Sequence, residues 1–404
     1  MLIRVAVAPS GFKESLSAQS AAEAIATGVR RVLPDAEIDL IPLVDGGEGT
    51  AEAMAAASGG RLVRLRATGP TGEPVPTHFA LLGDGETAVV EMAAVAGLSL
   101  VPRELRDPGA TTTRGVGELI RAALDTGARR ILVGCGDSGT SDGGAGALQA
   151  LGARLLDADG RELPHGGREL HRLDRIDAAG LDARLAATSI RVACNPFNVL
   201  CGERGVARVF GPQKGATPAQ VEQLAGNLEH WAAVLTRDLR VRTDLRTGTG
   251  TGASGGLGAG LAALGAELLP RFEVLLDDMD LDDRLARADL VITAEGALDH
   301  QTVRGKVPAE VARRAKRYGR PVLALAGTIG EGARQVYSAG VDAYGSILPA
   351  PMSLTEALGR GGEFLTDAAE RSLRMILIGT RLSSRESRQT AVSVSGTQRP
   401  SSVR

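Results

Sequence analysis

Short aliphatic runs alternate with alanine-rich amphipathic stretches along most of the chain. Apolar runs of this kind are typical of parallel strands buried on both faces, with helices connecting them. We predict strands over 3–8, 38–44, 87–92, 130–134, 189–193, 290–293, 321–326 and 343–347. We predict helices over 18–32, 50–57, 115–126, 143–151, 218–235, 256–264, 307–317 and 354–378. The alternation therefore predicts an α/β fold.

The length of 404 residues allows two α/β domains, since a domain usually has ~100 to 200 residues. The middle of the chain has its own series of strands and helices, which indicates an inserted domain over 76–275. Residues 1–75 and 276–382 would then build the other, discontinuous domain. Residues 383–404 are polar and lack periodicity and core residues, so we predict a disordered tail there.

Charge and composition exclude several classes of partner. The formal net charge of -2 gives no electrostatic footprint for nucleic acid or for an anionic membrane. No apolar run approaches the ~20 residues of a membrane span, and the first residues lack the features of a signal peptide. The three cysteines, Cys135, Cys194 and Cys201, form neither a CxxC pair nor a disulfide framework. We therefore expect a cytoplasmic protein with a small-molecule substrate; a homodimer is left open.

Lysine is the rare cation of this chain, because only four of its 46 basic residues are lysines. Three of them, Lys13, Lys214 and Lys306, lie next to glycine turns in GFKESLSA, GPQKGATP and RGKVPAE. An ammonium group on a flexible stem is a common ligand of phosphate. These three lysines are candidate phosphate ligands, and the alternative is a solvated charge near a turn. Lys316 lies on a predicted helix and reads as a surface residue.

Carboxylates form the second candidate group, and each follows shortly after an apolar run. They are Asp45, Glu48, Asp142, Glu295 and Asp299. Open α/β sheets bind ligands at the carboxyl ends of their strands. Carboxylates would repel phosphate, but Mg²⁺ held between them reverses the sign of the interaction. For Asp45 and Asp142 the alternative is helix capping, since aspartate before a helix is a favoured N-cap.

Glycine-rich backbone is the third candidate group. The stretch TGTGTGASGGLGAG, residues 247–260, can present amide groups to an anion, and Gly250, Gly252, Gly255 and Gly256 are the candidates. Its GxGxxG match is weak, because no apolar strand precedes it. Walker A, protein-kinase and HExxH signatures are absent, and neither GxSxG match, at Ser141 or Ser254, directly follows a strand. Acids, lysines and glycine loops without a histidine base suit phosphoryl transfer.

These segments resemble the bacterial glycerate kinases of the glycerate 2-kinase type, which phosphorylate D-glycerate with ATP to give 2-phosphoglycerate. The resemblance extends from residue 1 to about residue 380. It is carried by GFKESLSA, VDGGEGT, EMAAVAGLSLVP, TTTRGVGELI, TSDGGAGALQALGARLLDADG, FGPQKGAT, SGGLGAGL, AEGALDHQT and RGKVP. It implies a flavodoxin-like domain and an inserted restriction-enzyme-like domain, with the active site in the interdomain cleft.

The resemblance also implies ATP, Mg²⁺ and a set of site residues. The catalytic candidates are Lys13, Asp45, Asp142 and Asn195, and the metal candidates are Asp45, Asp142 and Glu295. The substrate-binding candidates are Ser10, Glu48, Arg114, Ser138 and Thr140. The nucleotide-binding candidates are Lys214, Gly250, Gly252, Gly255, Gly256, Glu295, Asp299 and Lys306. Arg114 is assigned to the glycerate carboxylate, which a guanidinium fork fits well; its alternative is an ordinary surface arginine.

The chain departs from the family pattern at two acids. Ser10 and Asn195 stand where acids are expected, and Asp137 is an additional acid in the turn GDSGTSDGG. An amide cannot act as a general base, although phosphoryl transfer depends mainly on positioning. Two alternatives to a glycerate kinase therefore stay open: a kinase for a different small hydroxy acid, and an impaired homologue that binds its ligands without turnover.

Overall fold

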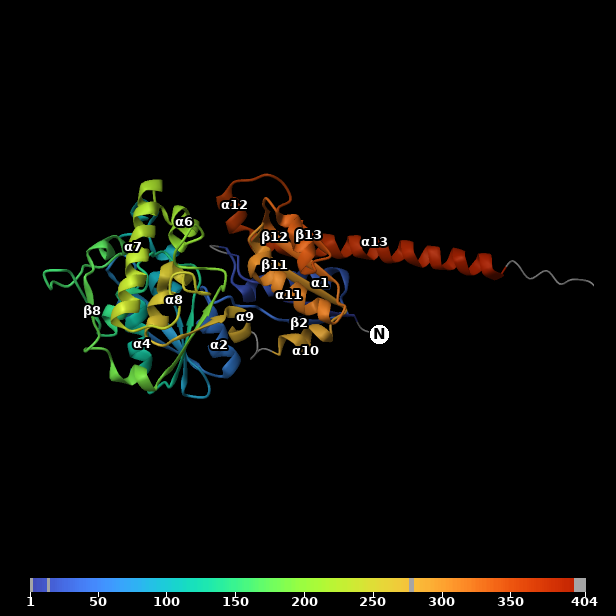
Figure 1. Cartoon of the computed structure of the whole chain (residues 1–404). Helices are drawn as coiled ribbons and strands as arrows, with labels where there is room; N and C mark the ends of the chain where they lie inside the picture. The colour runs from blue at the N-terminus through green and yellow to red at the C-terminus, as the bar shows by residue number, and fades with distance from the viewer. Residues whose placement is uncertain (1–2, 13–14, 276–279, 396–404) are drawn as a thin grey trace, which may run out of the picture. The chain divides into compact units, whose positions relative to one another are not determined.

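The computed structural model describes residues 3–12, 15–275 and 280–395, with side chains described to residue 379. The chain divides into two compact units (Figure 1). The split unit combines Met1–Leu43 with Leu281–Arg404, and the continuous unit is Val44–Asp280. Each is a layered α/β structure, so the predicted fold class is confirmed.

The split unit contains a five-stranded parallel sheet in the order β13-β12-β11-β1-β2. The strands are β1 (Arg4–Val7), β2 (Glu37–Leu40), β11 (Leu290–Leu298), β12 (Val322–Ile329) and β13 (Ala343–Ser346). The helices are α1 (Ala18–Val32), α10 (Leu281–Ala286), α11 (Val307–Arg317), α12 (Leu354–Gly359) and α13 (Gly361–Ser395). Short apolar strands such as RVAV are buried here because helices cover the sheet.

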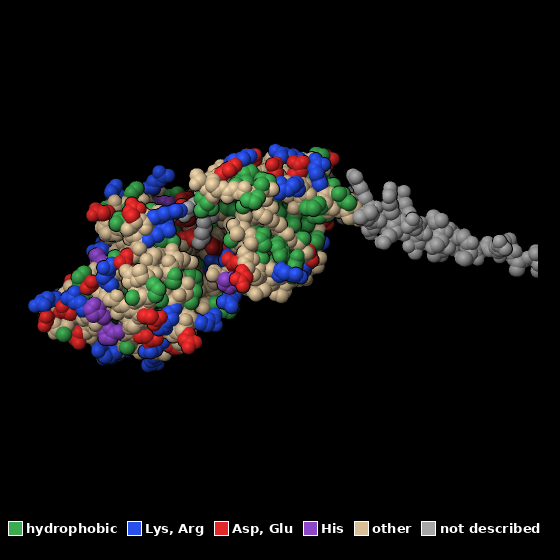
Figure 2. All heavy atoms as spheres, turned by 90° about the horizontal axis from the view of Figure 1, so that it is seen from above, with side chains coloured by type: hydrophobic (Ala, Val, Ile, Leu, Met, Phe, Trp, Pro, Cys, Tyr) green, Lys and Arg blue, Asp and Glu red, His purple; other side chains and the backbone are tan. Residues whose placement is uncertain are grey.

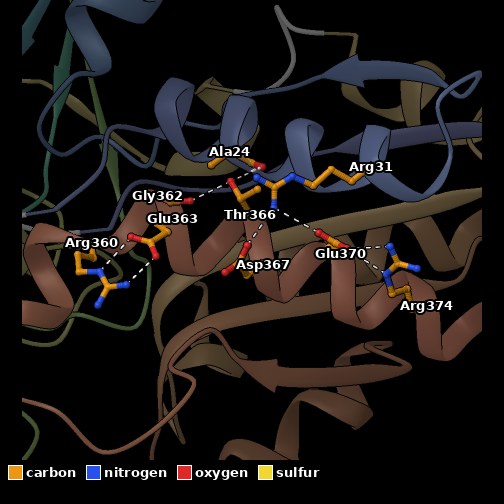
Figure 3. Close-up of polar contacts among 9 residues, drawn as sticks. All are labelled: Ala24, Arg31, Arg360, Gly362, Glu363, Thr366, Asp367, Glu370 and Arg374. Atoms are coloured by element: carbon orange, nitrogen blue, oxygen red, sulfur yellow. Dashed lines mark hydrogen bonds and ion pairs between the residues drawn. The ribbon is translucent and has the colours of Figure 1, made fainter.

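Helices α1 and α13 pack closely against each other in the split unit (Figure 3). Gly28 permits this approach, because a Cβ atom there would lie 2.3 Å from the carbonyl oxygen of Thr366. The Oγ1 of Thr366 donates to the Ala24 carbonyl at 3.0 Å, and Arg31 forms ion pairs with Asp367 and Glu370. Phe364 and Leu365 complete the contact from the apolar side of α13.

The continuous unit contains a six-stranded mixed sheet in the order β10-β9-β6-β5-β4-β3. The strands are β3 (Arg61–Thr68), β4 (Pro74–Leu81), β5 (Thr87–Glu91), β6 (Arg130–Gly134), β9 (Ser189–Cys194) and β10 (Glu267–Pro270), with β7 (Arg154–Leu156) and β8 (Arg175–Asp177) in a separate antiparallel pair. The helices are α2 (Thr50–Ser58), α3 (Ala93–Ala96), α4 (Arg114–Asp125), α5 (Ala145–Ala150), α6 (Val206–Phe210), α7 (Pro218–Asp238), α8 (Ala253–Ala263) and α9 (Arg271–Leu275). Strands β10, β9, β6 and β5 are parallel, whereas β4 and β3 are antiparallel additions.

All eight predicted strands and all eight predicted helical stretches are present, but three sequence-based expectations need correction. The sheet of the continuous unit is mixed, because the hairpin of β3 and β4 was missed: its arginines and prolines conceal an edge hairpin. The helix predicted over 354–378 is interrupted at Arg360, between α12 and α13. The predicted disordered tail is helical as far as Ser395, and residues 396–404 lie outside the described part of the chain.

The first domain boundary falls at residue 43 rather than near residue 75. The reason is strand pairing: β3 and β4 join β5 in the sheet of the continuous unit, so the segment 44–75 belongs there. On the face shown in Figure 2, basic and acidic side chains are interspersed. Among the described residues, no helix is both long and apolar enough to cross a membrane.

Replacing Gly28 by alanine should destabilise the split unit by about 1–3 kcal/mol, because the added methyl group overpacks the contact between α1 and α13. The matched control is Gly379→Ala on the same α13, where a Cβ atom meets nothing within 4 Å. It should be neutral or stabilise by up to about 1 kcal/mol. Tyr318, Tyr337 and Tyr344 all lie in the split unit and Trp231 lies in the other, so tyrosine and tryptophan signals follow the two units separately. Equal tyrosine transitions for both variants would contradict the close-approach argument.

Candidate active site

Two Asp-Gly-Gly turns of the continuous unit share one hydrogen bond. The Oδ1 atom of Asp45 accepts from the amide of Gly47 at 3.1 Å, and Oδ1 of Asp142 accepts from the amide of Gly144 at 3.1 Å. Both turns lead into a helix through a glycine in the left-handed conformation, which is Gly49 before α2 and Gly144 before α5. Glycine tolerates that conformation without a steric penalty. The backbones differ at the second glycine of the motif, because φ is positive at Gly144 but not at Gly47.

The turn at Asp45 lies against the end of β6, where the two backbones nearly touch. A Cβ atom on Gly136 would lie 2.6 Å from the Cα atom of Gly47, and one on Gly47 would lie 2.5 Å from Oδ2 of Asp137. Asp45 and Asp137 thus flank Gly47. Exposed Glu48 follows at the tip of the turn. We call Asp45, Glu48 and Asp137 the acid cluster.

Arg271, at the start of α9, binds Asp45 of the acid cluster. Its Nη1 donates to Oδ2 of Asp45 at 3.0 Å and to the Asp45 carbonyl at 3.1 Å. The Arg271 side chain is only 12% exposed, whereas that of Asp45 is 39% exposed, so the carboxylate still faces solvent. Sequence reasoning missed Arg271, because no motif distinguishes it from the many other arginines of the chain.

Asn195 lies at the end of β9, the parallel neighbour of β6. Its Oδ1 accepts from the amide of Phe197 at 3.0 Å. Gly46, in the turn that follows Asp45, lies close to the same end of β9, since a Cβ atom on Gly46 would lie 3.5 Å from the Ala193 carbonyl oxygen. The structure therefore brings the end of β9, which leads into Asn195, next to the turn at Asp45. Ligands of parallel α/β sheets bind at such carboxyl ends of strands.

Asp142 accepts the same hydrogen bond as Asp45, from the amide two residues along the chain, but lies in a different environment. Its carboxylate is fully buried and accepts hydrogen bonds from the amides of Thr113, Gly144 and Gly146 and from the Thr113 hydroxyl, at 2.8 to 3.2 Å. Burial raises the pKa of Asp142 above its ordinary value, while the bonds from Thr113 oppose that shift. Four donors occupy this carboxylate, which supports the capping alternative, and the catalytic and metal roles of Asp142 stay predictions.

Lys214 is buried and binds Ser138 and Thr140. Its Nζ donates to Oγ of Ser138 at 2.8 Å and to the Thr140 carbonyl at 2.6 Å. The residue is 2% exposed, and burial lowers the pKa of its ammonium group to about 7. Its ammonium is directed at the turn that connects Asp137 to Asp142, so the structure supports a structural role and not a surface phosphate contact.

The glycine-rich stretch is also internal. The amides of Gly250, Gly252 and Gly256 donate to the carbonyls of Pro196, Asn198 and Gly252. A Cβ atom on Gly255 would lie 2.0 Å from the Thr140 carbonyl oxygen. These glycines permit close packing of three loops, and the amides named above are not available to a phosphate. These contacts support a packing role, and the nucleotide-binding role of the four glycines stays a prediction.

Arg114 begins α4 and is partly committed to that helix. Its Nε donates to Oε1 of Glu118 at 3.1 Å, and Glu118 also accepts from the amide and hydroxyl of Thr68. The Arg114 side chain remains 35% exposed. Its binding of a substrate carboxylate stays a prediction.

The split unit carries the second group of candidates, at the carboxyl half of β11. Nζ of Lys306 lies 3.6 Å from Oε1 of Glu295 and 3.4 Å from Oδ1 of Asp299, and it donates to the Ala297 carbonyl at 3.2 Å. All three charged side chains are a quarter exposed or less. We call Glu295, Asp299 and Lys306 the Lys306 cluster; their roles toward phosphate and metal stay predictions.

Ser10 lies beside this cluster. Its amide and its Oγ both donate to the carbonyl of Ala294, at 2.9 and 3.2 Å, and the residue is 7% exposed. An ionised aspartate at this position could not donate to that carbonyl, so the Oγ bond is particular to the hydroxyl. Lys13 lies outside the described residues.

Comparisons with known proteins agree on one family. The model of the glycerate kinase family matches residues 5–377. The chain is 46% identical to the glycerate 2-kinase of Escherichia coli (strain K12) over 94% of this chain and 99% of that protein. It is also 46% identical to the glycerate kinase of Bacillus subtilis (strain 168), over 94% and 98% of the two chains. The crystal structure of a putative glycerate kinase 2 from Salmonella typhimurium LT2 is similar, with a TM-score of 0.76, 45% identity and coverage of 94% and 100%.

Replacing Asp142 by alanine should lower the free energy of unfolding of the continuous unit by about 3 kcal/mol, because four buried donors lose their acceptor. The control, Glu48→Ala, removes an exposed carboxylate and should change stability by less than about 0.5 kcal/mol. Fluorescence of Trp231 during denaturant unfolding measures both, since its Nε1 donates to the Gly143 carbonyl in the same turn. A stable but inactive Asp142→Ala protein would instead indicate a direct catalytic role.

Proposed function

The chain belongs to the glycerate kinase family and is therefore a kinase that acts on an alcohol group, and we propose that it phosphorylates D-glycerate with ATP to give 2-phosphoglycerate. The near full-length match to a protein named glycerate 2-kinase supports the choice of substrate and product. In the structure, the Lys306 cluster is the main support for phosphoryl transfer. One ammonium group between two carboxylates can neutralise phosphate while the acids hold a cation.

The split unit supports a flavodoxin-like description. Counted within this unit, its strand order β2-β1-β11-β12-β13 corresponds to 2-1-3-4-5, which is the flavodoxin order. In such sheets ligands bind where the order reverses, which here lies between β1 and β11. Ser10 follows β1, and Glu295 lies on β11. We therefore assign Ser10 and the Lys306 cluster to the phosphate end of ATP. The restriction-enzyme-like description of the other unit and the interdomain cleft stay predictions.

Mg²⁺ fits the acids of both candidate groups, because carboxylate oxygens are its preferred ligands. In the Lys306 cluster Glu295 and Asp299 converge on one ammonium group, so they can also hold a divalent cation. Asp45 is the further candidate ligand, since its carboxylate remains partly exposed. When bound, the cation would neutralise charge on the transferring phosphate oxygens.

The acid cluster is the proposed acceptor side. A glycerate hydroxyl needs a group that accepts its proton, and Asp45 can serve as this base whereas the amide of Asn195 cannot. Asp137 beside Gly47 adds a second carboxylate where the family pattern has none. Lys13, Glu48 and Arg114 remain proposed ligands of phosphate or of glycerate. The cytoplasm is the proposed location, since the three cysteines are buried thiols, and a homodimer stays a prediction.

Lys306→Met should lower kcat/KM for ATP by roughly 10- to 100-fold, because a charged partner of the phosphates is lost. Lys316→Met is the matched control: Lys316 lies on the surface of α11 and pairs with Asp342, so activity should stay within about twofold. A coupled assay of ADP formation with Mg-ATP and D-glycerate measures both. Equal activity of the two variants would remove the Lys306 cluster from the nucleotide site.

The wild-type protein should release ADP in proportion to added D-glycerate, and mass spectrometry of the product should identify 2-phosphoglycerate. A panel of small hydroxy acids in the same assay separates the alternatives. Faster turnover of another hydroxy acid would replace D-glycerate as the substrate. ATP binding without turnover of any member of the panel would indicate an impaired homologue.

A further inference from the structure

Glu91 caps a helix that lies next to the acid cluster. It is the last residue of β5 and is 2% exposed, and its Oε1 accepts a hydrogen bond from the amide of Ala51 in the first turn of α2. The residue that precedes α2, Gly49, has no side chain that could accept this bond. The first amides of a helix need an acceptor, and an anion is favoured there. A neighbouring strand therefore supplies the cap that the local sequence lacks.

The start of α2 is tied directly to the acid cluster. The hydroxyl of Thr50 donates to the Gly47 carbonyl at 2.8 Å, and the amide of Ala53 donates to the Gly49 carbonyl at 3.1 Å. Gly47 is the residue that separates Asp45 from Asp137. A displacement of the first turn of α2 would thus move the backbone that carries Asp45 and Glu48.

Charged side chains from two elements, α2 and β4, act on Glu91. Glu52 of α2 and His78 of β4 form an ion pair at 3.0 Å, and both act on Glu91 through their charges. Arg64 of β3 lies opposite His78 in the strand register. Burial raises the pKa of Glu91 to about 7, with Glu52 acting in the same direction and the bond from Ala51 opposing it. Burial therefore favours the neutral form of this carboxyl more than in an exposed glutamate.

We propose that Glu91 is a positioning residue for phosphoryl transfer: its carboxylate fixes the first turn of α2 and thereby the acid cluster. This inference rests on the proposed function only in that the acid cluster must face the substrate. The anionic form is the stronger acceptor for amide donors, so the geometry is best fixed at a pH above the pKa of Glu91. The expected activity falls as the pH drops through about 7.

The test compares Glu91→Gln with Glu52→Gln. The first keeps the shape of the side chain and one acceptor but removes the charge, whereas the second removes the ion pair with His78 and leaves the cap on Ala51. We expect Glu91→Gln to lower kcat for D-glycerate by about tenfold at pH 8 and to abolish the inflection of the kcat profile near pH 7. Glu52→Gln should retain kcat at pH 8 within about twofold. A kcat of Glu91→Gln within twofold of wild type, with the inflection retained, would overturn the proposal.

Amide hydrogen exchange gives a readout that does not depend on turnover. Glu91→Gln should accelerate exchange at residues 47–53 by about tenfold relative to wild type, while Glu52→Gln should leave those amides unchanged. Unchanged protection in Glu91→Gln would show that the carboxylate does not hold the turn, and would overturn the proposal even in an active enzyme. A wild-type protein that is inactive on every hydroxy acid, yet shows the expected exchange pattern, would reject the proposed function while leaving the mechanical link intact.

Discussion

The close approach of glycine backbones at the ends of β6 and β9 is the constraint on which the continuous unit depends. Gly47 lies against Gly136, and Gly255 lies against the Thr140 carbonyl, at separations that leave no room for a Cβ atom. Side chains anchored on these loops, including Asp45 and Asp137, can therefore lie within a few ångströms of one another. Glycine loses more conformational entropy on folding than other residues. At these positions the loss is accepted because only glycine allows the loops that carry the charged groups to approach so closely.

Burial decides what each Asp-Gly-Gly turn does. Asp45 and Asp142 have the same bond to an amide two residues along the chain, yet one carboxylate is partly exposed and paired with Arg271, while the other is enclosed by four donors. A fully buried carboxylate with both oxygens occupied stabilises the fold and has little access to a ligand. A partly exposed one can exchange its partners. The same sequence motif thus serves structure at one position and, in our proposal, chemistry at the other.

Because lysine is rare in this chain, each lysine could be singled out as a candidate. Its rarity did not show which lysine binds a ligand and which stabilises the fold. Lys306 is found between Glu295 and Asp299, which were identified as candidates separately from it. Lys214 is enclosed, and its ammonium group donates to a serine hydroxyl and a backbone carbonyl. The lysine at this position therefore meets a structural requirement. Arg271 and Glu91 were not predicted at all, because each acts on a segment far from it in sequence. Arginine and glutamate are common in this chain, and only the fold reveals their partners.

The sequence by itself determined the α/β class, the main strands and helices, the family, and the residue types that suit phosphoryl transfer. Those features depend on local periodicity and on ordered motifs, which are read along the chain. Only the tertiary structure decided that segment 44–75 joins the continuous unit, that the glycine-rich stretch is internal, and that Asp142 is a cap whereas Asp45 is accessible. These outcomes depend on strand pairing and burial between distant segments, and no local pattern encodes which amide, carbonyl or guanidinium will meet a given side chain.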